Sequence, residues 1–230
     1  MENLFNDFFD KRFAKSSTEK YGLYPLLWET IKQEIKENLL NFLKKDLENI
    51  QKRGFTPNNF ECPVKGTLTI NKKPVTLQAV ADRIDKSVDG KESIVIDYKS
   101  KYNAAAIERI IFVKSNLQPP IYLEILNRND NTCSSAELAF IEHEVKNPFK
   151  PLTLDQYNVM KTKFMTLLAL LEDLTSKGIF PIYPEDKDYC NFCDFKDICR
   201  KNHLPTAKRT RKSDYFKELK KFHYVPTRPK

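Results

Sequence analysis

Long hydrophobic runs are absent from this 230-residue chain. No stretch approaches the ~18 consecutive apolar residues that identify a membrane span. The first residues, MENLFNDFFDKRF, also lack the pattern of a secretory signal peptide. We therefore expect a cytoplasmic protein with no membrane partner. With 40% hydrophobic residues, the chain is long enough for one α/β domain with a sizeable core, which we favour over two small domains.

Cysteine and histidine are both scarce. The chain has five cysteines, an odd number, and three of them fall between Cys190 and Cys199, which argues against a disulfide framework and for a metal or cluster site. Only three histidines are present, and none precedes His143. A G-x-x-x-x-G-K-[ST] loop is missing as well, so any ATP-driven motor that works with this chain lies elsewhere.

The net charge of +8 is unevenly distributed. Residues Pro205–Lys230 hold nine Lys or Arg and two acids, which gives +7 and leaves about +1 for the rest of the chain. We therefore divide the chain into a domain at residues 1–204 and a basic C-terminal tail at residues 205–230. Such a tail can neutralise nucleic-acid phosphates, and the alternative is a disordered, solubilising segment.

Hydrophobic periodicity predicts an α/β order of elements. Apolar residues at three- and four-residue spacing indicate one long helix over Leu23–Arg53, which Gly54 is placed to end. Three strands forming a meander should follow, then a helix over Asn103–Lys114 and another that opens at Gln118-Pro119. A strand at Ala136–His143 should lie beside the third strand of the meander. A capping box at Thr153–Gln156 should start the last helix, which stops near Gly178.

The second and third strands carry the most informative residues. Val75–Ile84 and Ser93–Tyr98 are joined through Asp89-Gly90, a strong hairpin signal. A two-residue turn there pairs residues whose numbers sum to 179, so Asp82 faces Asp97. Opposed carboxylates, with Cβ atoms about 5 Å apart, are destabilising unless a cation lies between them, and Mg²⁺ and Mn²⁺ favour carboxylate oxygens. Lys99 projects from the same strand face as Asp97.

A solvated surface hairpin is the alternative interpretation. The charges follow Ile94, Val95 and Ile96, however, and charged groups forced toward an interior usually serve a function. The sequence therefore favours a metal site with an adjacent ammonium group.

The run A-x-x-D-R-I-D followed by I-V-I-D-Y-K-S resembles the RecB-like branch of the PD-(D/E)XK nuclease superfamily. The resemblance implies a restriction-endonuclease-like fold, with a central mixed β-sheet flanked by helices. It implies Mg²⁺ or Mn²⁺ held by Asp82, Asp97 and the backbone carbonyl of Tyr98, and Lys99 as the catalytic lysine. Asp85 would be a supporting residue. Ala79 replaces the family's usual glycine.

Two further family features need comment. Related nucleases often place a His on the helix before the strands, and here that ligand is either absent or replaced by an acid such as Glu29 or Glu34. A Q-x-x-x-Y element follows the D-Y-K strand in the same family, and Gln118 and Tyr122 match it. Their spacing puts both side chains on one helix face, where they can bind the DNA backbone or orient site residues.

The spacing C-x2-C-x5-C at Cys190, Cys193 and Cys199 resembles the C-terminal cysteines of AddB-type helicase–nuclease subunits and of CRISPR-associated exonucleases. In those proteins a fourth, upstream cysteine completes a [4Fe–4S] cluster, which normally requires four thiolates. Here the fourth ligand would be Cys62, which strand alternation places inward, Cys133, which the sequence places in a loop that could move, or a residue outside this chain. The alternative is a zinc site closed locally by His203.

Together these features predict a Mg²⁺- or Mn²⁺-dependent deoxyribonuclease, an exonuclease acting on single strands or ends in DNA repair or recombination. DNA is the expected partner, with a separate or fused helicase as a further one. One alternative is an inactive nuclease fold that binds DNA or serves as a scaffold. A second is a zinc-containing RNA-binding protein, which explains only the region from Cys190 onward.

Overall fold

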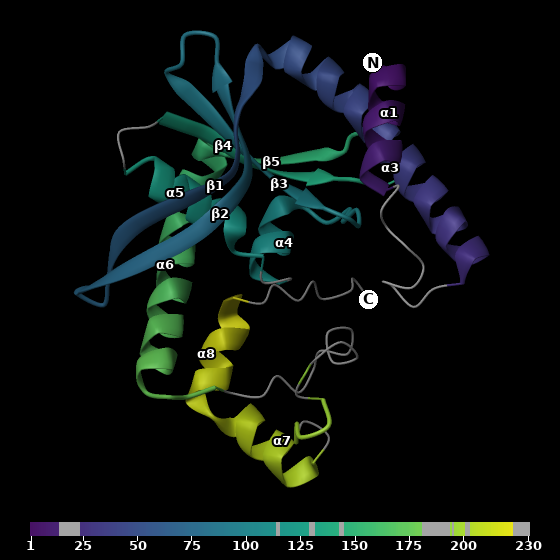
Figure 1. Ribbon diagram of the computed structural model, residues 1–230. Helices are drawn as coiled ribbons and strands as arrows, with labels where there is room; N and C mark the ends of the chain where they lie inside the picture. The colour runs from purple at the N-terminus through teal and green to yellow at the C-terminus, as the bar shows by residue number, and fades with distance from the viewer. Residues whose placement is uncertain are drawn as a thin grey trace, which may run out of the picture.

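The computed structural model describes residues 1–13, 24–113, 116–128, 132–142, 145–180, 194, 196–200 and 203–222. A five-stranded mixed sheet, in the order β1-β2-β3-β4-β5, lies between helices (Figure 1). Its strands are β1 (Phe55–Ile70), β2 (Lys73–Ser87), β3 (Glu92–Lys99), β4 (Thr132–Phe140) and β5 (Phe149–Thr153). The helices are α1 (Glu2–Phe13), α3 (Pro25–Arg53), α4 (Ile107–Phe112), α5 (Gln118–Leu126), α6 (Leu154–Ser176), α7 (Leu204–Lys212) and α8 (Asp214–Phe222). This arrangement confirms the predicted mixed sheet with flanking helices.

The predicted meander and its register are confirmed. Strands β1, β2 and β3 are successively antiparallel, and the β2–β3 ladder pairs Arg83 with Ile96 and Ile84 with Val95, so partner numbers sum to 179. The turn is longer than predicted, because the last pair of the β2–β3 ladder is Lys86 and Ser93 and the two strands end at Ser87 and Glu92. The Ser87 hydroxyl accepts the Glu92 N–H (3.0 Å) and donates to Asp89 (2.7 Å), which closes a four-residue turn in place of further ladder bonds.

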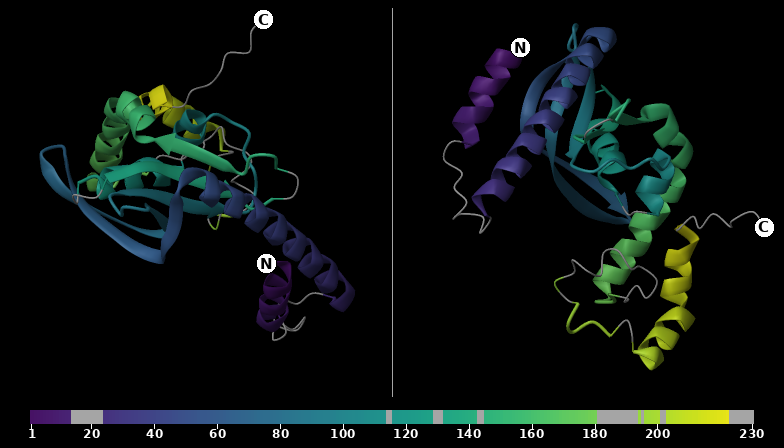
Figure 2. Two further views of the ribbon diagram at one scale, coloured as in Figure 1. Left: turned by 90° about the horizontal axis from the view of Figure 1, so that it is seen from above. Right: turned by 90° about the vertical axis from the view of Figure 1, so that its right-hand side faces the viewer.

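Helix α3 begins at Pro25 and ends at Gly54, whose left-handed conformation (φ +70°) suits glycine. Its C-terminal half packs on the sheet through Phe42, which joins Ile94 and Ile96 of β3 in a hydrophobic cluster. Its N-terminal half extends beyond the sheet, where α1 runs beside it (Figure 2). Helix α1 was not predicted.

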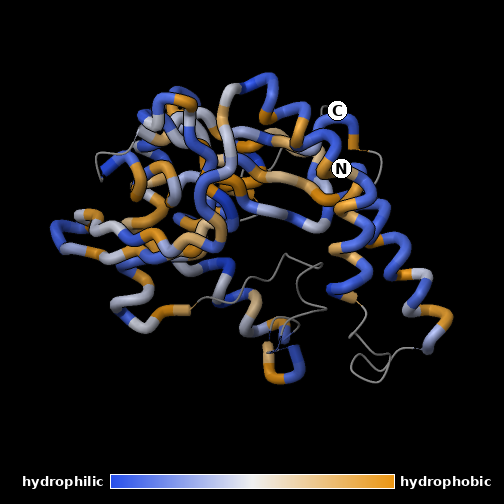
Figure 3. The backbone as a smooth tube through the Cα atoms, turned by 45° about the horizontal axis from the view of Figure 1, so that its top comes forward, coloured by the Kyte–Doolittle hydropathy of each residue, from blue (hydrophilic) through white to orange (hydrophobic). Residues whose placement is uncertain are grey.

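Helices α5 and α6 cover the opposite face of the sheet from α3. The main core lies here and combines alternate residues of β1, such as Val64 and Leu68, with Tyr122 and Leu123 of α5 and Phe164 of α6. The predicted capping box at Thr153 is present, since its hydroxyl accepts the Gln156 N–H (3.2 Å) and Gln156 returns a bond to the Thr153 N–H (3.1 Å). Apolar stretches alternate with polar ones along the helices (Figure 3), as expected for elements with one buried side.

Strand β4 lies parallel to β3 and therefore beside the Asp97 strand, as predicted. It begins at Thr132 and includes Cys133, for which the sequence predicts a movable loop. That expectation was wrong: Cys133 is fully buried, and its N–H and C=O bond to the Asn127 side chain.

The basic segment after Pro205 is helical as far as Phe222. Helix α8 contacts α6 and buries Phe216 and Phe222. The disordered alternative therefore does not describe residues 205–222, while the boundary at 204 stays a prediction. Among the described residues, no helix is both long and apolar enough to cross a membrane.

Candidate active site

Asp97 is the centre of the polar cluster that the sequence predicted. It lies near the end of β3, on the strand face toward α5, and is only 3% exposed. The Lys99 ammonium forms an ion pair with its Oδ2. Gln118 Nε2 donates to its Oδ1 (2.9 Å), and the Tyr122 hydroxyl lies 3.5 Å from the same oxygen.

Asp82 reaches this cluster because the β2–β3 ladder stops one step before it. The last paired residues are Arg83 and Ile96, and the next pair in this register is Asp82 and Asp97. The Tyr98 N–H, left without a strand partner from β2, donates to Asp82 Oδ2 (2.7 Å). One carboxylate oxygen of Asp82 therefore replaces a backbone acceptor where the two strands separate.

The Q-x-x-x-Y pair stands at the beginning of α5. Gln118 accepts from Lys99 Nζ (2.9 Å) while donating to Asp97, so its amide joins the two charged groups. The Tyr122 hydroxyl donates to the Val80 carbonyl of β2 (2.8 Å). Gln118 therefore contacts both Lys99 and Asp97, and Tyr122 ties α5 to β2.

The electrostatics of the cluster oppose the ionised form of Asp97. Burial raises the pKa of this carboxyl group, and the charge of Asp82 raises it further, while Lys99 and Tyr122 lower it. Burial, together with the Asp97 charge, raises the pKa of the Tyr122 phenol to about 12. Tyr122 is therefore a hydroxyl donor at neutral pH. The single positive charge of Lys99 does not balance the two negative charges of Asp82 and Asp97, which leaves a deficit of positive charge at the site.

A hard divalent cation fits this deficit. Asp82, Asp97 and the Tyr98 carbonyl offer oxygen ligands of the kind that Mg²⁺ and Mn²⁺ prefer. Asp97 Oδ2 is buried and accepts no hydrogen bond of standard geometry, although the Lys99 ammonium lies against it. In the part of the chain that the structure describes, no three His, Cys, Asp or Glu side chains are grouped as a metal site, so a cation here would rest on two carboxylates and a backbone oxygen.

A second charged cluster lies on the α3 face of the same strands. Arg83 of β2 is 3% exposed and forms an ion pair with Asp46 of α3 through two hydrogen bonds (2.5 and 2.9 Å). It forms a second ion pair with Asp85, which has one hydrogen bond (2.9 Å) and an Nε–Oδ1 distance of 2.7 Å. Asp85 thus lies on the opposite face from the Asp82 carboxylate and holds Arg83. Glu29 pairs with Lys32 on the exposed surface of α3.

Only one of the three predicted cluster cysteines lies within the described residues. Cys190 and Cys193 lie outside the described residues, whereas Cys199 is a half-buried free thiol. Burial raises the pKa of the Cys133 thiol to about 11, which disfavours the thiolate that a metal requires. His203, the alternative zinc ligand, contacts the Thr206 hydroxyl through Nδ1 (2.8 Å).

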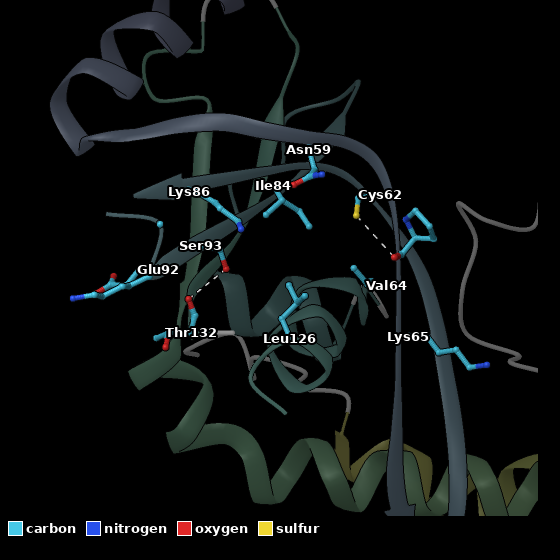
Figure 4. A pocket seen from close by; sticks show the side chains of 13 residues that line it. Asn59, Cys62, Val64, Lys65, Ile84, Lys86, Glu92, Ser93, Leu126 and Thr132 are labelled. Carbon is cyan, nitrogen blue, oxygen red and sulfur yellow. Dashed lines mark hydrogen bonds between the residues drawn. The ribbon is translucent and has the colours of Figure 1, made fainter. Parts of the chain in front are cut away.

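Cys62 lines a pocket of about 400 Å³ at the far end of α5 from Gln118 (Figure 4). The pocket lies between β1, the β2–β3 turn and Leu126, and Lys86 and Ser93 project into it. Because Ser93 and Asp97 are at opposite ends of β3, about 13 Å apart along the strand, this pocket is separate from the carboxylate pair.

Comparison with known proteins decides the family. The family model described as the PD-(D/E)XK nuclease superfamily matches residues 1–200. The chain belongs to the PD-(D/E)XK nuclease superfamily. Membership of this superfamily implies a phosphodiester hydrolase, and its nucleases generally use divalent metals such as Mg²⁺.

Other comparisons are weaker. No curated protein matches the sequence. A solved structure titled "Crystal structure of SSO0001" is similar with a TM-score of 0.42 at 21% identity, and the alignment covers 69% of this chain and 67% of that one. The likeness to the RecB-like branch, to AddB-type subunits and to CRISPR-associated exonucleases stays a hypothesis.

Proposed function

We propose that this superfamily member is a Mg²⁺- or Mn²⁺-dependent DNA nuclease whose site consists of Asp82, Asp97 and Lys99. The observation that carries the proposal is the convergence of two carboxylates, an ammonium and the Gln118 amide where β2 and β3 separate. Two opposed carboxylates, with the pKa of Asp97 raised, lower the stability of the folded protein, and this loss favours a functional role for them.

Each site residue has its own role in the proposed hydrolysis. Asp82, Asp97 and the Tyr98 carbonyl would hold the cation, which supplies Lewis-acid polarisation of the phosphate and neutralises developing negative charge. Lys99 would contact a phosphoryl oxygen or orient the attacking water. Gln118, bonded to both Lys99 and Asp97, keeps the ammonium directed at the site and can also bind the DNA backbone. Tyr122 fixes the start of α5 against β2.

The narrower assignments are also proposals. We propose exonuclease action on single strands or ends during DNA repair or recombination, in the cytoplasm and together with a helicase. The basic residues of α7 and α8 support DNA binding, since seven Lys or Arg face only two acids in residues 204–222.

An iron–sulfur cluster at Cys190, Cys193 and Cys199 is proposed on their spacing alone. Its fourth ligand would be Cys62 or a residue outside this chain, because burial disfavours Cys133. Iron, sulfide and zinc analysis of the purified protein separates this cluster from a Cys₃His zinc site that uses His203. A Cys193→Ser variant should lose the metal, and a Cys133→Ser variant should retain it.

One observation favours the alternative of an inactive DNA-binding fold. Only two acidic ligands meet in the described part of the site, which is few for a catalytic cation. A scaffold would bind DNA without cutting it under any metal condition. The RNA-binding alternative predicts tighter binding to RNA than to DNA.

The test is cleavage of end-labelled single-stranded DNA, double-stranded DNA and RNA in Mg²⁺, Mn²⁺ or EDTA. The proposal predicts metal-dependent shortening of DNA that EDTA abolishes. Binding without cleavage in every metal would replace the nuclease with the scaffold. The ladder of products then distinguishes end-directed from internal cutting.

A further inference from the structure

A pocket of about 270 Å³ lies directly beside Lys99. It stands where the parallel strands β3 and β4 end, the edge at which α/β sheets usually bind ligands. Its floor consists of Ile110, Leu138 and Phe140, which are buried and form a small cluster separate from the main core. Helix α4 supplies Ile110 and closes this side of the sheet (Figure 1).

The rim of the pocket is polar and positively charged. Its lining residues are Lys99, Ser100, Lys101, Asn103 and Asn116, and no acid lines it among the residues that the structure describes. An apolar floor accepts a flat ring, while ammonium, hydroxyl and amide groups at the rim suit phosphate and ring heteroatoms. This combination matches a nucleotide better than a peptide or a purely apolar ligand.

The wall of the pocket is held in place by Lys150 of β5. Its ammonium donates to the carbonyls of Asn103 (2.5 Å) and Ala105 (2.6 Å) and lies 5.2 Å from the centre of the Tyr102 ring. The Tyr102 ring in turn packs edge-on against Phe140, with 5.2 Å between ring centres. The loop after Lys99 is therefore fixed before any ligand arrives, which lowers the entropy lost on binding.

The pocket shares residues with the carboxylate site. Lys99 lines the pocket and also bonds Gln118 and Asp97, while the Asn116 side chain accepts the Gln118 N–H (3.3 Å). A phosphate bound at Asp82, Asp97 and Lys99 would therefore place an adjoining nucleotide at the mouth of the pocket.

We propose that this pocket binds the unpaired base of a nucleotide adjoining the scissile phosphate. The proposal rests on the function proposed above for the position of that phosphate. A base in a duplex is stacked and paired, and it must leave the helix to enter an apolar pocket. The pocket thus makes single strands and frayed ends the preferred substrates and gives a physical reason for that preference.

Binding to single-stranded oligonucleotides in EDTA tests the pocket without cleavage. A single abasic nucleotide is moved along the oligonucleotide, and the dissociation constant is measured at each position. The proposal predicts one position at which losing the base weakens binding about tenfold, which corresponds to one good stacking contact. Ser100→Trp, which fills the pocket from its exposed rim, should remove that dependence, and Lys101→Glu should weaken binding of every oligonucleotide.

Ser176→Trp, at the exposed end of α6, is the matched control and should retain the dependence on the base. Affinity that ignores the abasic site at every position would overturn the proposal, as would a dependence that persists in Ser100→Trp. Cleavage in Mg²⁺ then locates the cut, and a cut several nucleotides from the sensitive base would also overturn it. A base dependence in a protein that never cuts would support the pocket and refute the nuclease.

Discussion

Replacing Arg83 by methionine should destabilise the protein more than any surface substitution. Arg83 is 3% exposed, and its guanidinium is the cation between the buried carboxylates of Asp46 and Asp85. Burial lowers the pKa of this guanidinium, but the two carboxylates outweigh burial and raise the pKa overall. Removing one member of a buried ion pair leaves an uncompensated charge and costs about 3–5 kcal/mol.

This loss should depend on pH in a defined direction. Burial raises the pKa of Asp85 even with Arg83 present, so removing Arg83 should raise the pKa of this carboxyl group further. A carboxyl group whose pKa is raised in the folded state lowers the free energy of unfolding by its full amount above that pKa. The loss disappears as pH falls below the unfolded-state pKa of about 3.9. The Arg83→Met deficit should therefore be largest at pH 7 and shrink toward pH 4.

Thermal and urea unfolding of wild type and variant measure the effect. For a chain of this size, about 3–5 kcal/mol lowers Tm by roughly 6–20 °C. Lys73→Met is the surface control, because Lys73 pairs with Glu172 while 63% exposed and should cost less than about 1 kcal/mol. Replacing Asp46 and Asp85 by leucine in the Arg83→Met background should restore much of the loss. An Arg83→Met deficit below about 1 kcal/mol, or one independent of pH, would refute the reasoning.

Four further predictions concern the carboxylate site and the buried Cys133. Asp97→Asn should raise the Tm of the metal-free protein at pH 7, because it removes the charge of a buried carboxyl group whose pKa is raised. The gain in Tm should vanish near pH 4, and a lower Tm at pH 7 would contradict this prediction. Added Mg²⁺ should raise the Tm of wild type but not of Asp97→Asn, as differential scanning fluorimetry can show. Gln118→Leu should slow DNA cleavage about 10²-fold in single-turnover assays by releasing Lys99, and an unchanged rate would exclude a positioning role. Cys133, whose pKa is raised to about 11, should react with a thiol reagent at pH 8 only after unfolding, so rapid labelling of the native Cys133 would refute its burial.

Local signals in the sequence predicted the parts of the fold that local chemistry controls. The end of α3 follows from the glycine at residue 54, and the start of α6 follows from the Thr153 capping box. The register of the hairpin follows from strand alternation around Asp89-Gly90, although the Ser87 side chain lengthens the turn. These features predicted the proximity of Asp82, Asp97 and Lys99, because one register places all three.

Elements that depend on tertiary contacts were not predicted. Strand β5 is five residues long and contains Pro151, which an edge strand tolerates, and it exists by pairing with β4. Helix α1 is fully buried only at Phe9, although Phe5, Phe9 and Phe13 recur at four-residue spacing and pack on one another, a signal too short to predict the helix. The sequence around Cys133 reads as a loop, and only the pairing of β4 with β3 makes it interior.

The Arg83 cluster had a partial signal in the sequence. The run D-R-I-D places Arg83 and Asp85 on one strand face and Asp82 on the other, by alternation alone. The third member, Asp46, lies 37 residues upstream on α3, and only the packing of that helix on the sheet brings it to Arg83.

The decisive measurement is the single-turnover rate of DNA cleavage in Mg²⁺ for wild type, Asp97→Ala, Lys99→Ala and a control, Asp173→Ala, which changes a partly exposed acid of α6. Wild type and Asp173→Ala should cut at the same rate, while Asp97→Ala and Lys99→Ala should be slower by about 10²–10³-fold or more. In EDTA, Asp97→Ala and Asp173→Ala should bind the DNA at least as tightly as wild type, because neither change removes a positive charge, whereas Lys99→Ala should bind more weakly. Cleavage by Asp97→Ala or Lys99→Ala at the wild-type rate would contradict the assignment of the site.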